Sequence, residues 1–226
     1  AALVAVTFFA KDSAPDFRQD VVPALGYFSN WWQIYFVDTP YFAANSLPML
    51  RHLWSLAVEE QWYVVWPIVF VFVLGNKRVP RWISAVVIGL LATAVMVGIA
   101  LAFVADDETR INFLYLSTLT RSSGLLLGAA LACVWHPWKK AVVRFAKVRS
   151  GFADVLALGA LATLGYISAF IHVADKQLYM GGLAAATVAS AVIIAVVVRS
   201  GKSLVKRALS FPLLVEIGRR SYGLYL

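Results

Sequence analysis

The sequence has few of the residues from which most catalytic and metal sites are built. Cys133 is its only cysteine, so no internal disulfide can form, and there are three histidines. It contains no H-E-x-x-H, no cysteine and histidine cluster, no G-x-S-x-G, no P-loop and no G-x-G-x-x-G. These absences argue against zinc enzymes, α/β-hydrolases and nucleotide-binding folds. We expect no metal site and no bound cofactor.

Charge is scarce as well. Charged residues make up 14% of the chain, against about 25% in soluble domains, while 61% is hydrophobic and the mean hydropathy is +0.76. Several apolar stretches reach the roughly 20 residues that cross a bilayer. They are residues 53–74, 83–104, 111–135, 151–171 and 179–198. We predict an all-α polytopic transmembrane helical bundle, with about five complete spans plus a partial helix at each end, in one membrane-embedded domain (1–226).

The two ends of the sequence predict a longer protein. Residues 1–10 are apolar from the first position and have no Met and no basic leader, so we do not expect them to be a signal peptide. Residues 221–226 have the character of the start of another span. We therefore expect the chain to be an internal fragment of a larger polytopic protein.

The distribution of charge predicts the topology. The connectors 75–82, 136–150 and 199–220 hold 14 of the 20 Lys and Arg residues, whereas the alternate loops hold most of the acids. By the positive-inside rule the basic connectors are cytoplasmic, in a cell inner membrane. The net charge of +8 is then a topology signal and not a nucleic-acid signal, although a secondary role in holding an anionic cofactor or lipid headgroup stays open. Residues 11–52 become an extracytoplasmic aromatic-rich loop, with a short re-entrant or surface helix near 21–35.

Three charged residues inside predicted spans suggest a site. Glu59 and Glu60 lie roughly 10 Å inside the first complete span, and Arg121 lies roughly 15 Å inside a span that runs the same way. A charge at such depth costs roughly 2.5–3.5 kcal/mol, so opposite charges there are expected to pair. We predict an ion pair or water-bridged contact between Arg121 and Glu59 or Glu60. It is either a structural lock between two helices or part of a functional site.

Several polar or aromatic residues are predicted to share one face of the central helix, because they recur at i, i+3, i+7 and i+10. They are His52, Ser55, Glu59 and Trp62. A His and a Glu on one face can perform acid–base chemistry. The alternative is an interfacial His that ends the span.

Other features predict structure and not chemistry. Asp154 lies near the start of a span, where the helix dipole favours an acid. Gly124 and Gly128 form a GxxxG pattern directly after Arg121, which predicts close approach of a second helix. Pro67 removes a backbone hydrogen bond and permits a kink in the central helix.

The residues around these charges resemble a known family. The stretch H-L-W-S-L-A-V-E-E-Q-W-Y at residues 52–63 resembles the signature of the membrane acyltransferase 3 family. Residues 27–32, 120–128 and 221–226 are similar to its aromatic–Asn motif, its Arg–Gly motif and the start of a later-helix motif, in the family's order. The resemblance extends over the whole chain.

This resemblance implies a bacterial inner-membrane enzyme that moves an acyl group, often acetyl, from acyl-CoA to a hydroxyl of a glycan or a similar acceptor. Its expected partners are acyl-CoA, the acceptor and the lipid bilayer, with no nucleic acid. Catalytic roles follow for Glu59, Glu60 and Arg121. Substrate-binding roles follow for His52, Ser55, Asn30, Trp62 and Tyr63. The family's first helix carries an Arg and a His regarded as essential, and this chain begins after it, so we expect the fragment alone to be inactive.

Two other classes compete with the acyltransferase. One is a non-enzymatic transporter or flippase with a buried Glu–Arg pair, and the other is a structural subunit whose charges fix helix registry. The sequence has no inverted repeat and no matching pair of broken helices, which argues against a transporter.

Overall fold

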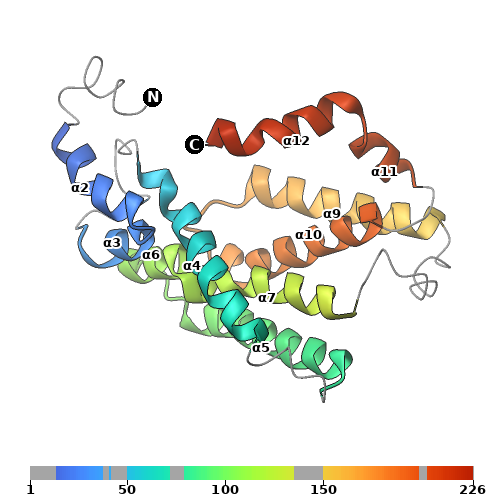
Figure 1. Ribbon diagram of the computed structural model, residues 1–226, viewed down its shortest axis with the longest axis horizontal. Helices are drawn as coiled ribbons and strands as arrows, with labels where there is room; N and C mark the ends of the chain where they lie inside the picture. The colour runs from blue at the N-terminus through green and yellow to red at the C-terminus, as the bar shows by residue number, and fades with distance from the viewer. Residues whose placement is uncertain are drawn as a thin grey trace. The chain divides into compact units, whose positions relative to one another are not determined.

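The computed structural model describes residues 14–37, 41, 50–71, 79–134, 150–198 and 203–225. Every regular element in these ranges is helical, and no strand occurs within them (Figure 1). The predicted all-α fold is therefore confirmed. The chain divides into two compact units: an N-terminal unit, Ala1–Val79 with Leu101–Ser122, and a C-terminal unit, Pro80–Ala100 with Ser123–Leu226.

The helices that are long and apolar enough to cross a membrane are Arg81–Ala102, Glu108–Val134, Gly151–Phe170 and Leu178–Val198. They correspond to four of the predicted spans and confirm a multi-pass membrane fold. The remaining predicted span, residues 53–74, contains α4 (Trp54–Val69), and its residues 72–74 lie outside the described residues. The partial helix predicted over residues 1–10 also lies outside them.

The described helices of the N-terminal unit are α2 (Ala14–Leu25), α3 (Ser29–Tyr35), the short 3-10 helix η2 (Arg51–Leu53), α4, α6 (Glu108–Leu116) and the start of α7 (Thr118–Val134). Within this unit α3 packs against α2, η2, α4 and α6. Its apolar core is formed by Trp54, Val58 and Leu116, with Ile34 and Tyr115 packed against them. The core thus joins the central helix to α6.

The loop 11–52 contains more helix than the sequence predicts. The expected short helix near residues 21–35 is present as two helices, α2 and α3. α3 has one buried face, formed by Ser29, Asn30 and Gln33, and its re-entrant or surface placement in the membrane stays a prediction. A polar face can be buried where hydrogen-bond partners meet it, and Asn30 and Gln33 both find partners on other segments.

The predicted single span 111–135 is two helices. α6 ends at Leu116, Ser117 is extended (φ −64°, ψ 134°), and α7 begins at Thr118. Hydroxyl groups replace backbone bonds at this point: Ser117 Oγ accepts from the Leu119 N–H at 3.2 Å, and Thr120 Oγ1 donates to the Ser117 carbonyl at 2.8 Å. Serine and threonine compete with helical hydrogen bonding in this way, so the polar belt breaks the helix.

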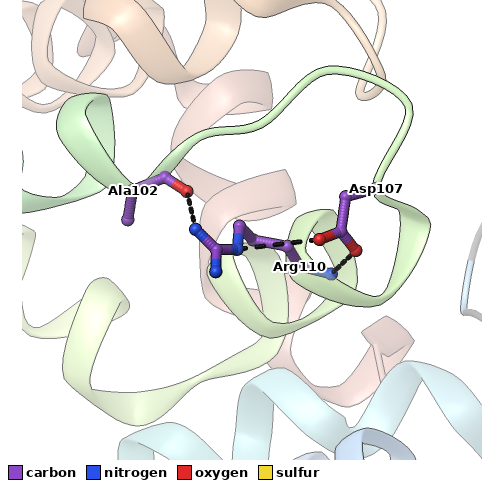
Figure 2. A network of polar contacts seen from close by, with 3 residues as sticks. All are labelled: Ala102, Asp107 and Arg110. Atoms are coloured by element: carbon purple, nitrogen blue, oxygen red, sulfur yellow. Dashed lines mark hydrogen bonds and ion pairs between the residues drawn. The ribbon is translucent and has the colours of Figure 1, made fainter.

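Figure 2 shows how the turn before α6 is closed. Asp107 is the N-cap of α6, and its Oδ1 accepts from the Arg110 N–H at 2.9 Å. The Arg110 guanidinium donates to the carbonyl of Ala102, the last residue of α5 (Arg81–Ala102), at 3.2 Å. Its Nε lies 3.7 Å from Asp107 Oδ2. A cation at a helix C-terminus complements the helix dipole, so one residue stabilises the end of α5 and the start of α6.

In the C-terminal unit α9 (Ser150–Phe170) packs along α10 (Leu183–Val198), which follows the short π-helix η5 (Leu178–Gly182) (Figure 1). Small side chains permit this contact, since Ala153 and Ala157 are buried against Val196. The connector 199–220 and the partial helix predicted from residue 221 are also more helical than expected. They contain α11 (Leu204–Leu209) and α12 (Pro212–Tyr225), and α12 starts with a proline, which is favoured in the first turn.

The helix-dipole role of Asp154 stays a prediction, and the structure shows a second structural role for this side chain. Asp154 lies in the first turns of α9, and its Oδ1 also accepts from Ser203 Oγ at 2.5 Å and from the Val205 N–H at 3.3 Å. It therefore connects α9 to the start of α11. At the GxxxG pattern, a Cβ on Gly124 would be in ordinary van der Waals contact with Thr187 of α10, at 3.8 Å, and one on Gly128 would meet no described atom within 4 Å. Among the described residues a second helix therefore lies against Gly124 and not against Gly128.

Candidate functional site

A closed ring of hydrogen bonds joins three distant side chains in the N-terminal unit. Asn30 Nδ2 on α3 donates to Thr118 Oγ1 at 2.9 Å, and Thr118 Oγ1 donates to Gln61 Oε1 at 2.5 Å. Gln61 Nε2 on α4 donates to Asn30 Oδ1 at 3.0 Å, which closes the ring. Asn30 is fully buried. Because each member is both donor and acceptor, the ring holds α3, α4 and the start of α7 in one register.

The ring is also connected to the backbone around it. Gln61 Oε1 accepts a second bond from Trp31 Nε1 at 3.2 Å, and Gln61 Nε2 donates to the Tyr27 carbonyl at 2.8 Å. Gln61 thus uses both amide hydrogens and both acceptor positions. Asn30 Nδ2 donates to the carbonyl of Leu116, the last residue of α6, at 3.3 Å. That carbonyl has no helical partner beyond the break, so the ring satisfies a group that the break exposes.

A second polar layer supports the entry to the central helix. Gln33 Nε2 donates to the Arg51 carbonyl at 3.0 Å, and Asn112 Nδ2 donates to the Gln33 carbonyl at 3.4 Å. Asn112 Oδ1 accepts from the Tyr41 N–H at 3.1 Å. Arg51 is 4% exposed, a buried charge that the sequence analysis missed because it precedes the predicted span. These bonds tie η2 to α3 and α6.

A cavity of about 880 Å³ lies against the ring, entirely within the N-terminal unit. It is formed by the turn after α2, by α3, by the middle of α4 and by the first turns of α7. Besides Gln61 and Thr118, its lining includes Tyr27, Trp31, Glu60, Trp62, Leu119 and Ser122. A mostly apolar cavity with a few convergent polar groups is typical of a small-molecule site.

The two adjacent carboxylates have different surroundings. Glu60 is half-buried and lines the cavity. Glu59 is exposed and is not among the lining residues. Successive residues on a helix turn by about 100°, which separates the two side chains. Glu60 is therefore the carboxylate that a molecule in the cavity would meet.

Arg121 lies one turn past the helix break and is held by the end of α6. Its Nε donates to the Tyr115 carbonyl at 2.7 Å. Its guanidinium carbon lies 4.1 Å from the ring centroid of Tyr115 and 5.2 Å from that of Trp54. Both distances allow cation–π attraction, which offsets part of the cost of placing the cation among apolar groups.

No direct ion pair of Arg121 with Glu59 or Glu60 is found among the described residues, and the water-bridged contact stays a prediction. The prediction rested on equal depth in the membrane, and equal depth does not decide which way side chains face. The break at Ser117 changes the direction of the helix just before Arg121, whose side chain reaches the carbonyl and ring of Tyr115 on α6.

Only two of the five predicted substrate-binding residues belong to the ring or to the cavity lining. Asn30 lies in the ring and Trp62 lines the cavity. His52 and Ser55 are half-buried, Tyr63 is 63% exposed, and these three do not line the cavity. His52 belongs to η2 and not to α4, so it does not continue the α4 face that the spacing predicts. The roles assigned to these residues stay predictions.

Sequence reasoning missed Gln61, Thr118, Trp31 and Tyr27. The prediction used charged residues inside apolar stretches as its criterion, and uncharged amides and hydroxyls do not meet it. The one available signal for Gln61 was its position directly after the carboxylate pair. Tyr27 has a positive φ of 54°, and its carbonyl accepts the Gln61 bond in this turn. No group of three or more His, Cys, Asp or Glu in the described ranges is placed to hold a metal ion.

The sequence of the chain is similar to a known family and to several known proteins. The chain matches the model of the acyltransferase domain family over residues 20–226. It is 34% identical over 230 aligned positions to the O-acetyltransferase OatA of Staphylococcus aureus (strain NCTC 8325 / PS 47), covering 99% of this chain and 36% of that protein. It is 36% identical over 225 positions to the peptidoglycan O-acetyltransferase OatA of Listeria monocytogenes, covering 97% of this chain and 34% of that protein.

A putative O-acetyltransferase of Staphylococcus aureus (strain COL) is 32% identical over 229 positions, covering 98% of this chain and 36% of that protein. The chain thus spans about a third of the length of these curated relatives. No solved structure matches the chain significantly. Because the family model covers nearly the whole chain, this chain belongs to the acyltransferase domain family that its motifs resemble.

Proposed function

We propose that this chain is the membrane-embedded part of an O-acetyltransferase, which moves an acetyl group from an acyl thioester such as acetyl-CoA to a hydroxyl of a glycan. The observation that carries the proposal is Glu60, a half-buried carboxylate on the wall of a cavity built from the family's motifs. The similar proteins that are named O-acetyltransferases support the reaction, and the one named for peptidoglycan supports a glycan acceptor.

In the proposed reaction Glu60 acts as the general base. The acceptor hydroxyl attacks the thioester carbonyl, and its proton passes to the Glu60 carboxylate. A C–O ester bond forms and the C–S bond breaks. Glu60 then returns the proton to the departing thiolate, so the products are an acetyl ester and a thiol.

We propose that Arg121, besides its predicted catalytic role, positions the end of α6 relative to the start of α7. Its bond to the Tyr115 carbonyl holds the end of α6 next to the start of α7, and Leu119 and Ser122 of α7 line the cavity. Glu59 keeps its predicted catalytic role, although it is exposed. We also propose that the basic connectors 75–82, 136–150 and 199–220 face the cytoplasm, where acetyl-CoA is made.

Substitution of Glu60, with an acid outside the cavity as control, tests the proposal. In the full-length protein, Glu60→Gln keeps the shape but removes the base, and we expect transfer of label from radiolabelled acetyl-CoA to envelope glycans to fall by about 10²–10⁴-fold. Glu108→Gln, at an exposed carboxylate of α6 that does not line the cavity, is the control, and we expect it to retain most activity. Equal activity of wild type and Glu60→Gln at equal protein levels would refute the role of Glu60.

One observation favours the transporter alternative. The α6–α7 span is discontinuous, and transporters bind substrates at broken helices. The buried Glu–Arg pair that supported this alternative is not found among the described residues. Movement of glycan across the membrane without any acetylation would favour the transporter.

A further inference from the structure

We propose that the cavity of the N-terminal unit is the acceptor subsite, and that it binds a neutral sugar ring and not the anionic part of the acyl donor. The inference rests on the proposed function and deepens it, because it says which of the two substrates this cavity receives. It is argued from the charge, the aromatic walls and the rigidity of the cavity.

The charge of the lining excludes a polyanion. Glu60 is the one carboxylate among the described lining residues, and no Lys, Arg or His is among them. The phosphates of acyl-CoA or of a lipid headgroup require cationic side chains or free helix N–H groups. The first turn of α7 does reach the cavity, but the Leu119 N–H already donates to Ser117 Oγ. A carboxylate near this end further disfavours a second anion, whereas it accepts hydrogen bonds from sugar hydroxyls.

The walls suit a ring that has one apolar face and a polar edge. Tyr27, Trp31 and Trp62 bring aromatic surface to the cavity, which supplies a large contact area with little loss of side-chain entropy. The edges of such a ring carry hydroxyls, and Glu60 and Ser122 lie in the lining to meet them.

The size and rigidity of the cavity fit a small preorganised site. Its volume of about 880 Å³ lies in the range of about 300–1,000 Å³ found for small-molecule sites. Gln61 fixes its walls, because the same amide bonds Trp31 on α3, Thr118 on α7 and the carbonyl of Tyr27. A wall held by satisfied hydrogen bonds does not have to be ordered when the ligand binds.

A cavity-filling substitution with a matched control tests the inference. Val64 is 67% exposed and lines the cavity, whereas Ile68, one turn later on α4, is 55% exposed and does not line it. The full-length protein in detergent is titrated by calorimetry with a neutral β-linked N-acetylglucosamine trimer and, separately, with acetyl-CoA. We expect Val64→Trp to raise the Kd of the trimer at least about tenfold, and Ile68→Trp to leave it within about twofold. The Kd of acetyl-CoA stays within about twofold in both.

Other outcomes overturn the inference. A raised Kd for acetyl-CoA in Val64→Trp makes the cavity a donor site. Failure of the wild-type protein to bind the trimer at millimolar concentration also rejects it, as does equal trimer affinity of wild type and Val64→Trp. Leu119→Trp, at a lining residue that is 66% exposed, is the second variant if Val64→Trp does not fold. One outcome separates this inference from the proposed function. If the wild-type protein binds the trimer, and Val64→Trp abolishes that binding, but the wild-type protein has no transferase activity, the proposed function is refuted and the inference stands.

Discussion

Three consecutive residues of α4 have three different environments. Glu59 is exposed, Glu60 lines the cavity, and Gln61 makes hydrogen bonds with all its donors and acceptors. The chemistry of the site depends on this rotation of about 100° per residue, because it places one carboxylate at the cavity and an amide against α3 and α7. A shift of one residue in the helix register would exchange the carboxylate and the amide.

The ring should contribute measurably to stability. Thr118→Val keeps the shape of the side chain but leaves Asn30 Nδ2 and Gln61 Oε1 each without one partner. We expect the free energy of unfolding to fall by about 1–3 kcal/mol, because buried polar groups lose a hydrogen bond. Denaturant titration of the full-length protein in detergent measures this change.

Thr93→Val is the control for this prediction. The Thr93 hydroxyl also makes a hydrogen bond, to the Gly89 carbonyl of its own helix, but the side chain is exposed. We expect a change within about 0.5 kcal/mol for it. Equal effects of the two substitutions would mean that the ring adds nothing beyond an ordinary helical threonine.

At the scale of whole elements, the break between α6 and α7 is the feature that shapes the site. An uninterrupted helix over 108–134 would have no end at Leu116, so its carbonyl would not be available to Asn30. It would also carry Arg121 away from the Tyr115 carbonyl, which it now reaches. Non-helical backbone at membrane depth persists only where protein groups satisfy it, and here Asn30, Arg121 and the serine hydroxyls do so.

Asp154 is expected to hold α11 in place. Asp154→Ala removes the acceptor of Ser203 Oγ and of the Val205 N–H, both at the start of α11. We expect a loss of about 1–3 kcal/mol and faster amide hydrogen exchange over α11. Hydrogen exchange read by mass spectrometry measures the second effect directly.

Asp175→Ala is the matched control, since Asp175 is a half-buried acid whose Oδ2 accepts from the N–H of His172 in the same turn. We expect it to leave exchange in α11 unchanged. Unchanged exchange in both variants would contradict a capping role for Asp154.

At the scale of the whole molecule, the apolar surface is what a membrane requires. Leu90, Leu101, Val155 and Leu158 are more than half exposed on helices long enough to span a bilayer. In water such surface would promote aggregation, whereas in a bilayer it contacts lipid. Six of the fourteen buried apolar residues of these helices are alanines, and small side chains let helices approach closely in a membrane.

The charge-derived topology can be tested with single cysteines. Cys133 is the only cysteine in these 226 residues, so Cys133→Ala removes the cysteine from this part of the protein. In that background we expect Ala105→Cys, in the loop between α5 and α6, to react with a membrane-impermeant maleimide in intact cells. We expect Ser210→Cys, between α11 and α12, to react only after the cells are permeabilised. Labelling of Ser210→Cys in intact cells would invert the topology.

The sequence by itself determined the fold class, the membrane spans and the family of this chain. The helical class and four spans follow from hydropathy and length, because a backbone in lipid must satisfy its own hydrogen bonds. The family follows from the contiguous motif at residues 52–63, which needs no tertiary information. The sequence indicates Glu59 and Glu60 together for the same reason, as acids in an apolar stretch, and does not choose between them.

The partners of these residues were decided only by the tertiary structure. Hydropathy places Arg121 at a depth, but the direction of its side chain depends on the break at Ser117, which depends in turn on local hydroxyl bonds. The ring joins Asn30 to Thr118 across 88 positions of sequence, and no local pattern encodes that contact. Hydrogen bonds are directional and burial is not, so composition predicts which segments enter the membrane, and packing decides which polar groups meet there.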